Sequence, residues 1–488
     1  MKNTELHGQG QSGGRVKTLL TDTLLFGLSN FGSKILIFFL TPLYTALLTI
    51  EEFGVADLIN TTVQFIYPIF TLAIMEATLR YAMKKDASPR AVFNNSVLLV
   101  TLATLVLLCF QPLFGLIAPS LRTHWLVFVV TFGLFNLYLC FTNFIKGLGM
   151  TKLFAVASIV HTVALVCSNL ILLLWLRWGL QGYLISIIIA YSAALVLMFL
   201  CAKMWRYMWP LLPDWKLLRE MLLYSTPMIP AILAWSINTS IDKYMIIAFV
   251  GMGANGIYSA AHRVPTLLST VTGIFLQAWQ LSAIHNSEAK DEEAYYTNVY
   301  RALHVVGLCG CFVIIPLSKV FSVILFDSAY YTAWQAIPLL TISAFFSTTS
   351  GFLAAAFRAH MKPKNLFSSV AIGALVNIVL NLLLIPRFGI IGAATATAIS
   401  FAVIFTVRAV SVQSLVRIRV DVWRAVPTYL LLFLSSFLIT FDVPFSTVAF
   451  LASAVLILLI YYRDIVNLIR SSLAIVKGVM AKRKGGSV

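Results

Sequence analysis

The sequence predicts an all-α integral membrane protein of about fourteen transmembrane helices, arranged as two six-helix lobes followed by two extra C-terminal helices. Of its 488 residues, 60% are hydrophobic and only 11% are charged, whereas soluble proteins carry about 25% charged residues. The hydrophobic residues gather in long segments, and a helix needs about 20 apolar residues to cross a bilayer. A short motif near residue 180 also recurs near residue 390, which indicates an internal repeat.

The repeated motif is Arg-aromatic-Gly-x-x-Gly, which follows an apolar segment at 177–182 and again at 387–392. Each copy comes after an asparagine and, further upstream, a lysine (Asn169 and Lys152; Asn381 and Lys364). Duplicated hydrophobic units are typical of secondary transporters, whose similar halves rock around a central site. The repeat therefore favours a transporter over an enzyme, and we expect the motif itself to form a structural hairpin.

Fourteen segments are long and apolar enough to span the membrane. They are residues 19–48, 54–77, 92–117, 125–145, 154–176, 182–201, 221–250, 256–281, 303–325, 334–357, 366–385, 390–410, 423–441 and 445–461. The predicted divisions are an N-terminal segment (1–18), an N-lobe (19–202), a linker (203–219), a C-lobe (220–411), spans thirteen and fourteen (412–462) and a basic tail (463–488). The tail is either an amphipathic helix at the interface or a solvated basic end.

Basic residues alternate from loop to loop in the pattern that the positive-inside rule gives for this set of spans. One side carries the large basic groups, from Arg15 and Lys17 through the linker to the tail. The other side holds only Arg122, Arg177 and Arg387. Both termini are therefore expected in the cytoplasm.

Composition also argues against several functions. The net charge is +17, but nucleic-acid-binding proteins concentrate basic residues in one patch or stripe. Here the basic residues lie in small groups between apolar segments, so no nucleic-acid partner is expected. The polar start is no signal peptide, and the first apolar segment is long enough to stay in the membrane. All six cysteines fall within or at the ends of apolar segments, where we expect buried small side chains, no disulfide and no metal site; no cofactor is expected.

Ionisable residues at mid-bilayer cost about 2.5–3.5 kcal/mol each on insertion scales, so they usually face a cavity or a partner. The deepest are Asp22, Lys34, Asp242, Lys243 and Lys319, and Glu76, His161, His262 and Arg263 lie less deep. Asp22 near the end of its span can extend to the interface instead, whereas Lys34 near mid-span is a candidate lumen residue. Lys319 follows Pro316 and can also extend outward.

Asp242 and Lys243 are adjacent, so their side chains point about 100° apart around a helix. One of them can face a lumen while the other pairs with a neighbouring helix, for which Arg263 is a candidate. A purely structural ion pair is the alternative. The same span contains Pro227 and Pro230 and several hydroxyl side chains, which makes it the best candidate for a moving helix that lines the cavity.

Several motifs resemble a known family. The stretch Leu48-Thr49-Ile50-Glu51-Glu52-Phe53-Gly54 is similar to the LTPEEYG loop of polysaccharide transporters in the multidrug/oligosaccharidyl-lipid/polysaccharide flippase superfamily. Residues 224–244, 256–259 and 277–280 resemble the start of that family's second half, and the pattern from Asn381 to Gly392 resembles a later part. The resemblance covers essentially the whole chain and points to the Wzx-type flippases.

The resemblance implies a two-lobed helical bundle that moves lipid-linked sugar repeat units to the outer leaflet of a bacterial cytoplasmic (inner) membrane. For O-antigen and many other surface polysaccharides the carrier is undecaprenyl diphosphate. Partners would be the lipid-linked oligosaccharide, membrane lipids, and the polysaccharide polymerase and chain-length proteins. Cationic lumen residues of the family make Lys34, Lys243, Arg263 and Lys319 the candidate substrate-binding residues.

Ion coupling would need a titratable carboxylate, for which Asp242, Asp57 and Glu76 are candidates. The main alternative function is a multidrug antiporter of the same superfamily, which would favour acidic groups in its lumen. The deep charges here are mostly basic, which favours an anionic substrate. A membrane enzyme would need a sizeable outer loop, and a non-transporting scaffold would have no use for duplicated halves.

Overall fold

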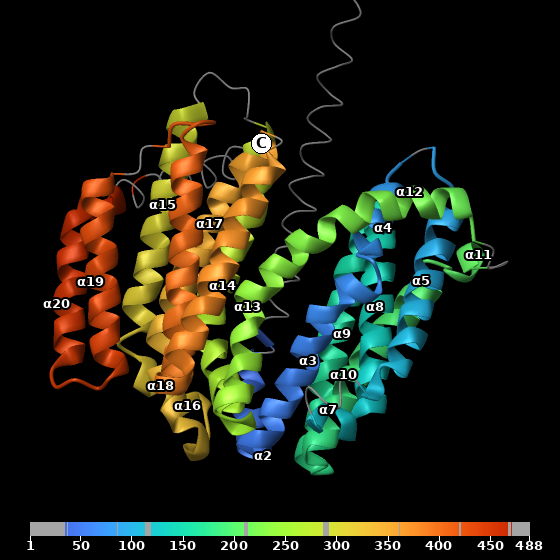
Figure 1. The fold of residues 1–488 in the computed structure, drawn as a ribbon, viewed down its shortest axis with the longest axis horizontal. Helices are drawn as coiled ribbons and strands as arrows, with labels where there is room; N and C mark the ends of the chain where they lie inside the picture. The colour runs from blue at the N-terminus through green and yellow to red at the C-terminus, as the bar shows by residue number, and fades with distance from the viewer. Residues whose placement is uncertain are drawn as a thin grey trace, which may run out of the picture. The chain divides into compact units, whose positions relative to one another are not determined.

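The computed structural model describes residues 35–466 apart from 37, 85, 113–118, 209–212, 286–291, 361 and 419–420, and also residue 470. Every regular element in this described part is a helix (Figure 1). The helices form two compact units: unit 1 comprises residues up to Ala260 together with Leu325–Tyr330, and unit 2 comprises Ala261–Ile324 and the chain from Tyr331 onward. The predicted all-helical membrane fold is therefore confirmed.

Unit 1 is built from helices that cover most of the first half of the chain. They are α2 (Thr41–Leu47), α3 (Ile50–Phe70), α4 (Ile74–Ala82), α5 (Pro89–Cys109), α7 (Pro119–Thr123), α8 (Trp125–Gly147), α9 (Thr151–Asn169), a π-helical turn (Leu170–Trp175), α10 (Gly179–Cys201), α11 (Trp205–Met208), α12 (Trp215–Ser225), a 3₁₀ turn (Thr226–Met228), α13 (Ile229–Phe249) and the start of α14 (Met252–His285). Its core is rich in aromatic side chains, among which Phe93 packs on Phe141 and Phe144.

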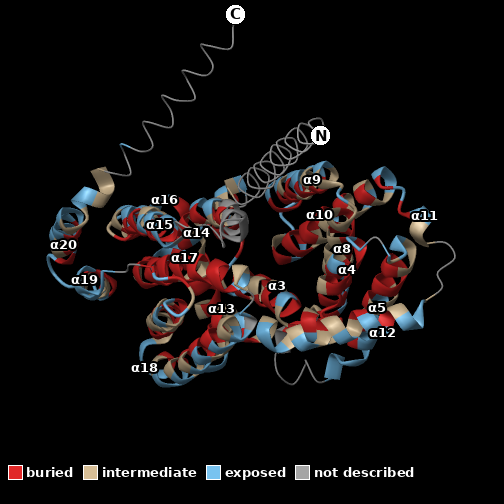
Figure 2. Ribbon diagram, turned by 90° about the horizontal axis from the view of Figure 1, so that it is seen from above, coloured by how far each residue is buried: buried red, intermediate tan, exposed pale blue. Residues whose placement is uncertain are grey.

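Unit 2 continues α14 and adds helices up to the end of the described chain. They are α15 (Glu292–Ile314), α16 (Ser318–Leu325), a 3₁₀ segment (Ser328–Gln335) that runs in from unit 1, α17 (Ile337–Ala359), α18 (Pro363–Val412), α19 (Val422–Thr440) and α20 (Ser446–Ile460). Nearly every residue of α17 is buried, as its red ribbon in Figure 2 shows. It is the central helix of this unit and packs against α15, α18 and α19.

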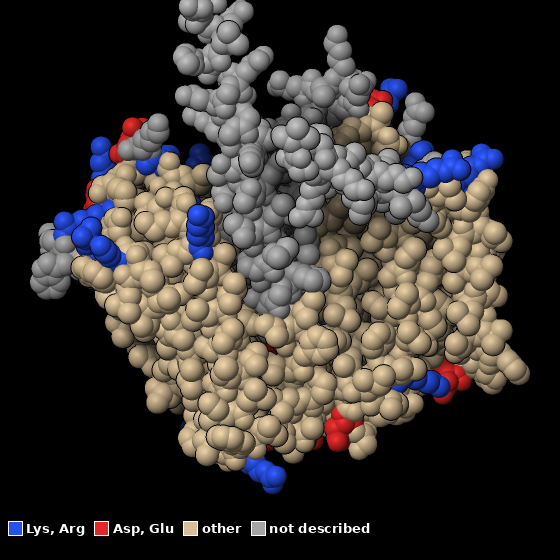
Figure 3. Space-filling view, turned by 180° about the vertical axis from the view of Figure 1, so that it is seen from behind, with Lys and Arg blue, Asp and Glu red and all other residues tan. Residues whose placement is uncertain are grey.

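Eight described helices are each long and apolar enough to cross a membrane, or nine if the bent pair α3–α4 counts as one span. One of the eight, α18, contains two arms joined at Gly389, where the backbone leaves the helical region. Most of the first predicted span (19–48) lies outside the described residues. Figure 3 shows a wide uncharged surface with Lys and Arg mainly at its margins. The chain is a multi-pass membrane protein, and the expected fourteen spans are consistent with these helices.

The second predicted span, 54–77, is not one straight helix. It is broken into α3 and α4, which meet at 68°. Leu72 and Ala73 both adopt positive φ angles of 51° and 52° at the break, a conformation that costs non-glycine residues about 1 kcal/mol or more each. Ser225 Oγ donates a hydrogen bond to the Leu72 carbonyl (2.8 Å), which holds one of the peptide groups released by the break. No glycine lies at this break to signal it in the sequence.

The seventh predicted span, 221–250, is also divided. An amphipathic helix, α12, ends at Ser225, and the longer helix α13 begins only at Ile229, after Pro227. Four of the cysteines are exposed rather than buried, namely Cys109, Cys167, Cys201 and Cys309. That expectation was wrong because outward-facing positions of a membrane helix meet lipid, so a small apolar side chain need not be in the core.

The two copies of the repeated motif form similar hairpins. Gly179 and Gly389 occupy equivalent positions with φ of 54° and 53°, a region that favours glycine. In each copy the second glycine, Gly182 or Gly392, packs against a carbonyl of the preceding helix, where a side chain would collide. The first copy has two more residues between its asparagine and its arginine, and its π-helical turn takes up extra length.

Candidate functional site

A cluster of polar side chains lies in unit 1, between α3 and α13. Lys243 Nζ donates to Asp57 Oδ1 at 2.9 Å and to Thr61 Oγ1 at 3.3 Å. The side chains of Lys243 and Asp57 are only 14% and 12% exposed. A charge pair this far from water is held by direct contact, because the medium screens it weakly.

Asp242, the neighbour of Lys243, is engaged differently. It is 1% exposed, and Tyr258 on α14 donates a short hydrogen bond from its hydroxyl to Asp242 Oδ2. Asp242 Oδ1 accepts from the backbone N–H of Lys243 at 2.9 Å. Beside this contact, the hydroxyl of Tyr244 on α13 donates to Thr62 Oγ1 on α3 at 3.0 Å. The two adjacent charged residues therefore point to different partners, as their helical spacing predicts.

The beginning of α3 and the beginning of α14 support this cluster through a close helix crossing. A side chain on Gly54 would collide with the Met252 carbonyl, and one on Gly256 with the Ile50 carbonyl. Small residues at such a crossing let two backbones approach within a membrane. Asn255 Nδ2 donates to the Gly54 carbonyl at 3.0 Å, so the approach is also hydrogen-bonded.

The LTIEEFG motif explains why α3 starts where it does. Thr49 caps the helix: its side chain accepts from the Glu52 N–H, and the Glu52 side chain accepts from the Thr49 N–H, a reciprocal capping box. Burial, together with nearby carboxylates of which Glu52 is the strongest, raises the pKa of Tyr330. Its protonated hydroxyl donates to the Thr49 carbonyl at 2.8 Å. The motif is thus a structural anchor for the helix that carries Asp57.

Of the seven candidate residues, the structure brings together Lys243, Asp57 and Asp242. Lys34 lies outside the described residues. Glu76 is on α4, partly buried, and lies near the Lys146 ammonium rather than in the cluster. Its coupling role stays a prediction.

The remaining two candidates lie in unit 2. Lys319 on α16 is paired with Asp442 at 2.6 Å, its side chain is 44% exposed, and its ammonium lies 4.5 Å from the Trp334 ring centre. This placement fits the alternative in which Lys319 extends to the interface. Arg263 on α14 is partly buried. The lumen roles of both stay predictions.

Sequence reasoning missed the partners of the site. It named Asp57 and Lys243 for separate roles and did not place them together, because they lie 186 residues apart. It also missed Thr61 and Tyr258. A signal was present for Tyr258, because a tyrosine inside a membrane span needs a hydrogen-bond partner for its hydroxyl.

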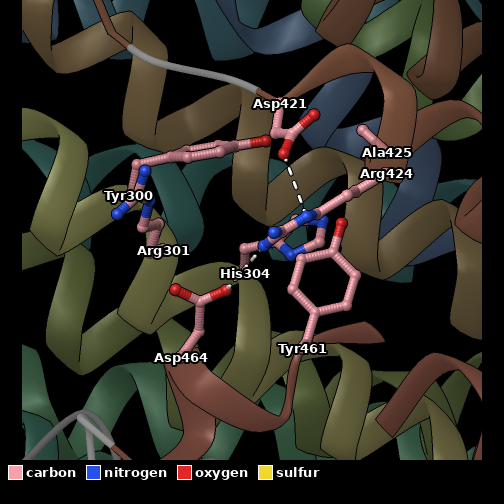
Figure 4. A pocket seen from close by; sticks show the side chains of 8 residues that line it. All are labelled: Tyr300, Arg301, His304, Asp421, Arg424, Ala425, Tyr461 and Asp464. Atoms are coloured by element: carbon pink, nitrogen blue, oxygen red, sulfur yellow. Dashed lines mark ion pairs between the residues drawn. The ribbon is translucent and has the colours of Figure 1, made fainter. Parts of the chain in front are cut away.

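Unit 2 has a polar pocket of its own, shown in Figure 4. It is lined by Tyr300, Arg301, His304, Asp421, Arg424, Ala425, Tyr461 and Asp464. Arg424 lies between Asp421 and Asp464, at 3.0 and 3.9 Å, and buried His304 shares a 2.9 Å hydrogen bond with Tyr429. The enclosed space is about 40 Å³, which suits a water or two but not a sugar. This pocket is best explained as the polar junction that joins α15, α19 and α20.

No group of three or more His, Cys, Asp and Glu side chains suited to a metal is found among the described residues. The unit 1 cluster itself consists of an ammonium and a carboxylate that hold each other, with hydroxyls beside them.

Known proteins resemble this chain in sequence and in fold. A family model described as "Polysaccharide biosynthesis protein" matches residues 19–280. The probable low-salt glycan biosynthesis flippase Agl15 of Haloferax volcanii is 26% identical over 212 residues, which cover 42% of this chain and 44% of that protein. The match thus spans less than half of this relative's length.

Two solved structures share the fold. The lipid II flippase MurJ, in an inward closed conformation, aligns with a TM-score of 0.68 and 15% identity over 91% of this chain and 100% of that chain. An inward-facing multidrug resistance MATE family transporter of the MOP superfamily aligns with a TM-score of 0.63 and 11% identity over 78% of this chain and 95% of that chain. At these identities the likeness establishes the fold alone.

Proposed function

Because the chain belongs to the polysaccharide biosynthesis protein family, whose model it matches over more than half of its length, we propose that it is a flippase for lipid-linked oligosaccharides. Its substrate is an undecaprenyl-diphosphate-linked repeat unit of O-antigen or another surface polysaccharide. It moves this unit from the cytoplasmic to the periplasmic leaflet of the bacterial inner membrane by alternating access, with both of its own termini in the cytoplasm. It is a transporter and not an enzyme.

The observation that carries the proposal is the buried ion pair between Lys243 and Asp57. A sugar cannot cross hydrocarbon unaided, because each unpartnered hydroxyl costs about 4–8 kcal/mol to transfer from water to hydrocarbon. A polar path through the protein removes that cost while the prenyl chain stays in lipid. The diphosphate needs a cation along the path, and Lys243 on α13 is a largely buried lysine that could supply it.

In the described structure the Lys243 ammonium is already bound to Asp57 at 2.9 Å. A diphosphate that binds Lys243 must therefore displace the Asp57 carboxylate. A displaced carboxylate in this poorly hydrated place is stabilised by taking up a proton or a cation. Substrate binding and ion uptake are then coupled at one pair of side chains, with Asp57 as the coupling residue and Lys243 as the substrate-binding residue.

The direct test is lipid flipping by the purified chain in proteoliposomes. The substrate carries a fluorescent oligosaccharide on undecaprenyl diphosphate, and a membrane-impermeant quencher reports the fraction in each leaflet. The full chain should accelerate exchange between leaflets, and Lys243→Ala should slow it about tenfold or more, because a charge-assisted hydrogen bond contributes about 1.5–3 kcal/mol. Lys216→Ala on the amphipathic helix α12 is the matched lysine control and should flip at the wild-type rate.

The second candidate function is multidrug antiport, and one observation favours it. The described cluster contains two carboxylates, Asp57 and Asp242, and one ammonium, so it is less basic than the sequence predicts. A cationic drug could take the place of the Lys243 ammonium on Asp57. Proton-dependent ethidium efflux by the reconstituted chain, with no flipping of the lipid-linked sugar, would replace the flippase proposal with this one.

A further inference from the structure

Unit 2 contains a buried arginine that no carboxylate neutralises. Arg408 lies on α18, one turn before the helix ends at Val412, and is only 4% exposed. Its guanidinium bonds to neutral groups: Nε donates to Ser369 Oγ at 2.9 Å, and Nη1 donates to the carbonyl and hydroxyl oxygens of Ser350 at 3.0 and 3.3 Å. No ion pair joins Arg408 to an acidic residue within the described part of the chain.

Three of the five N–H donors of Arg408 are used in these bonds, since Nε has one and Nη1 has two. The two on Nη2 have no acceptor among the residues that the structure describes. Nη2 is nevertheless absent from the fully enclosed polar atoms that lack a partner. Nη2 is therefore not fully enclosed by the described residues.

A second arginine lies close by. Arg358, in the last turn of α17, is exposed and close enough to Arg408 for their like charges to interact. The two helices pack along each other within unit 2 (Figure 1). Lys362 and Lys364 follow at the start of α18. Two guanidiniums lie near one end of this helix pair with no carboxylate partner among the described residues, and the uncompensated positive charge of Arg408 is costly to bury.

We propose that Arg408 and Arg358 form a binding site for a phosphate group, in which Ser350 and Ser369 hold the Arg408 guanidinium in position while their own hydroxyls donate to helix carbonyls. A phosphate offers several acceptor oxygens and negative charge, and a guanidinium N–H that is not already used can donate a charge-assisted hydrogen bond to it. Nη2 of Arg408 supplies the deep contact, and Arg358 supplies the contact nearer the helix ends. The phosphate is carried by an anionic membrane lipid, by the lipid-linked oligosaccharide, or is free in solution. The site is distinct from the Asp57–Lys243 pair and would exist whether or not the chain is a flippase.

The test measures the thermal unfolding of the purified full chain in a neutral detergent as each ligand is titrated. The probes are phosphatidylglycerol, diacylglycerol with the same acyl chains, undecaprenyl diphosphate and inorganic phosphate. A phosphate site predicts that phosphatidylglycerol raises Tm while diacylglycerol does not. Stabilisation by undecaprenyl diphosphate alone, or by inorganic phosphate alone, would identify that compound as the source.

Arg408→Gln should weaken the effective ligand about tenfold or more, since it removes one charge-assisted contact. Ser369→Ala keeps the guanidinium and tests the site in a second way if Arg408→Gln does not fold. It should lower the affinity for the ligand about threefold. Arg417→Gln removes an exposed arginine beyond the end of α18 and should leave the response unchanged. The proposal is overturned if no phosphate compound raises Tm, or if Ser369→Ala and Arg408→Gln respond as the wild type does.

Discussion

The two units bury a cation in different ways. In unit 1, Lys243 is held by the carboxylate of Asp57 at 2.9 Å, with Thr61 beside it. In unit 2, Arg408 is held by serine hydroxyls and a carbonyl, with no carboxylate partner described. The first arrangement supplies its own counter-ion, which the proposed substrate would have to displace. The second supplies none, so an anion can bind without displacing anything. We infer that unit 1 is suited to exchanging the counter-ion of Lys243 for a substrate, and that unit 2 is suited to retaining an anion at Arg408.

The largest effect should come from removing the counter-ion in unit 1. Asp57→Ala leaves the Lys243 ammonium unpaired in the membrane interior, and breaking a buried ion pair costs about 3–5 kcal/mol. Thermal unfolding in detergent should show a large fall in Tm. The double variant Asp57→Ala/Lys243→Ala should recover part of that loss. If the fall in Tm of the double variant equals the sum of the two single falls, Asp57 and Lys243 do not stabilise each other. Unit 1 would then no longer differ from unit 2 in supplying its own counter-ion.

A smaller effect is expected from the neighbouring carboxylate. Tyr258→Phe removes the hydroxyl that donates to Asp242, and a hydrogen bond to a charged group contributes about 1.5–3 kcal/mol. The loss should be visible in Tm, while the Asp57–Lys243 pair stays intact. The control is Tyr331→Phe, whose ring is exposed at the edge of unit 2. Equal Tm values for both variants would indicate that the Asp242 contact has no structural role.

The smallest effect concerns the hairpins, in which the units are alike rather than different. Gly179→Ala and Gly389→Ala each place a side chain on a residue with φ near 53°, at a cost of about 1 kcal/mol. Gly273→Ala is the control, since it lies within α14 in open space and without a positive φ. Similar falls in Tm for Gly179→Ala and Gly389→Ala, with no fall for Gly273→Ala, would show that the repeated motif has a structural role. A much larger loss of transport than of stability in either would point instead to a role in substrate release.

The sequence predicted the helical membrane fold and the hairpins because both follow from local patterns: apolar length, and glycines at fixed spacing. It also identified Asp242 and Lys243 as unusual. It could not pair Lys243 with Asp57, because that contact depends on which helices become neighbours. Nothing in the local sequence of Arg408 shows that its side chain turns inward to Ser350 and Ser369.

The break after α3 was missed for a related reason. Leu72 and Ala73 adopt positive φ without any glycine, and the nearest signal, Pro68, lies four residues earlier. The break is stabilised by Ser225, a residue far along the chain. Where tertiary contacts hold an unfavourable backbone, local propensity gives no warning.

The proposed transport depends most on the exchange of the Asp57 carboxylate for a diphosphate at Lys243. Calorimetric titration of the purified chain with undecaprenyl diphosphate, in two buffers of different ionisation enthalpy, measures the protons taken up on binding. The wild type should take up protons when the diphosphate binds, and Asp57→Asn should bind the ligand with no such uptake, because its amide cannot be protonated in this range. Equal proton uptake by both proteins, or binding that persists undiminished in Lys243→Ala, would contradict the exchange.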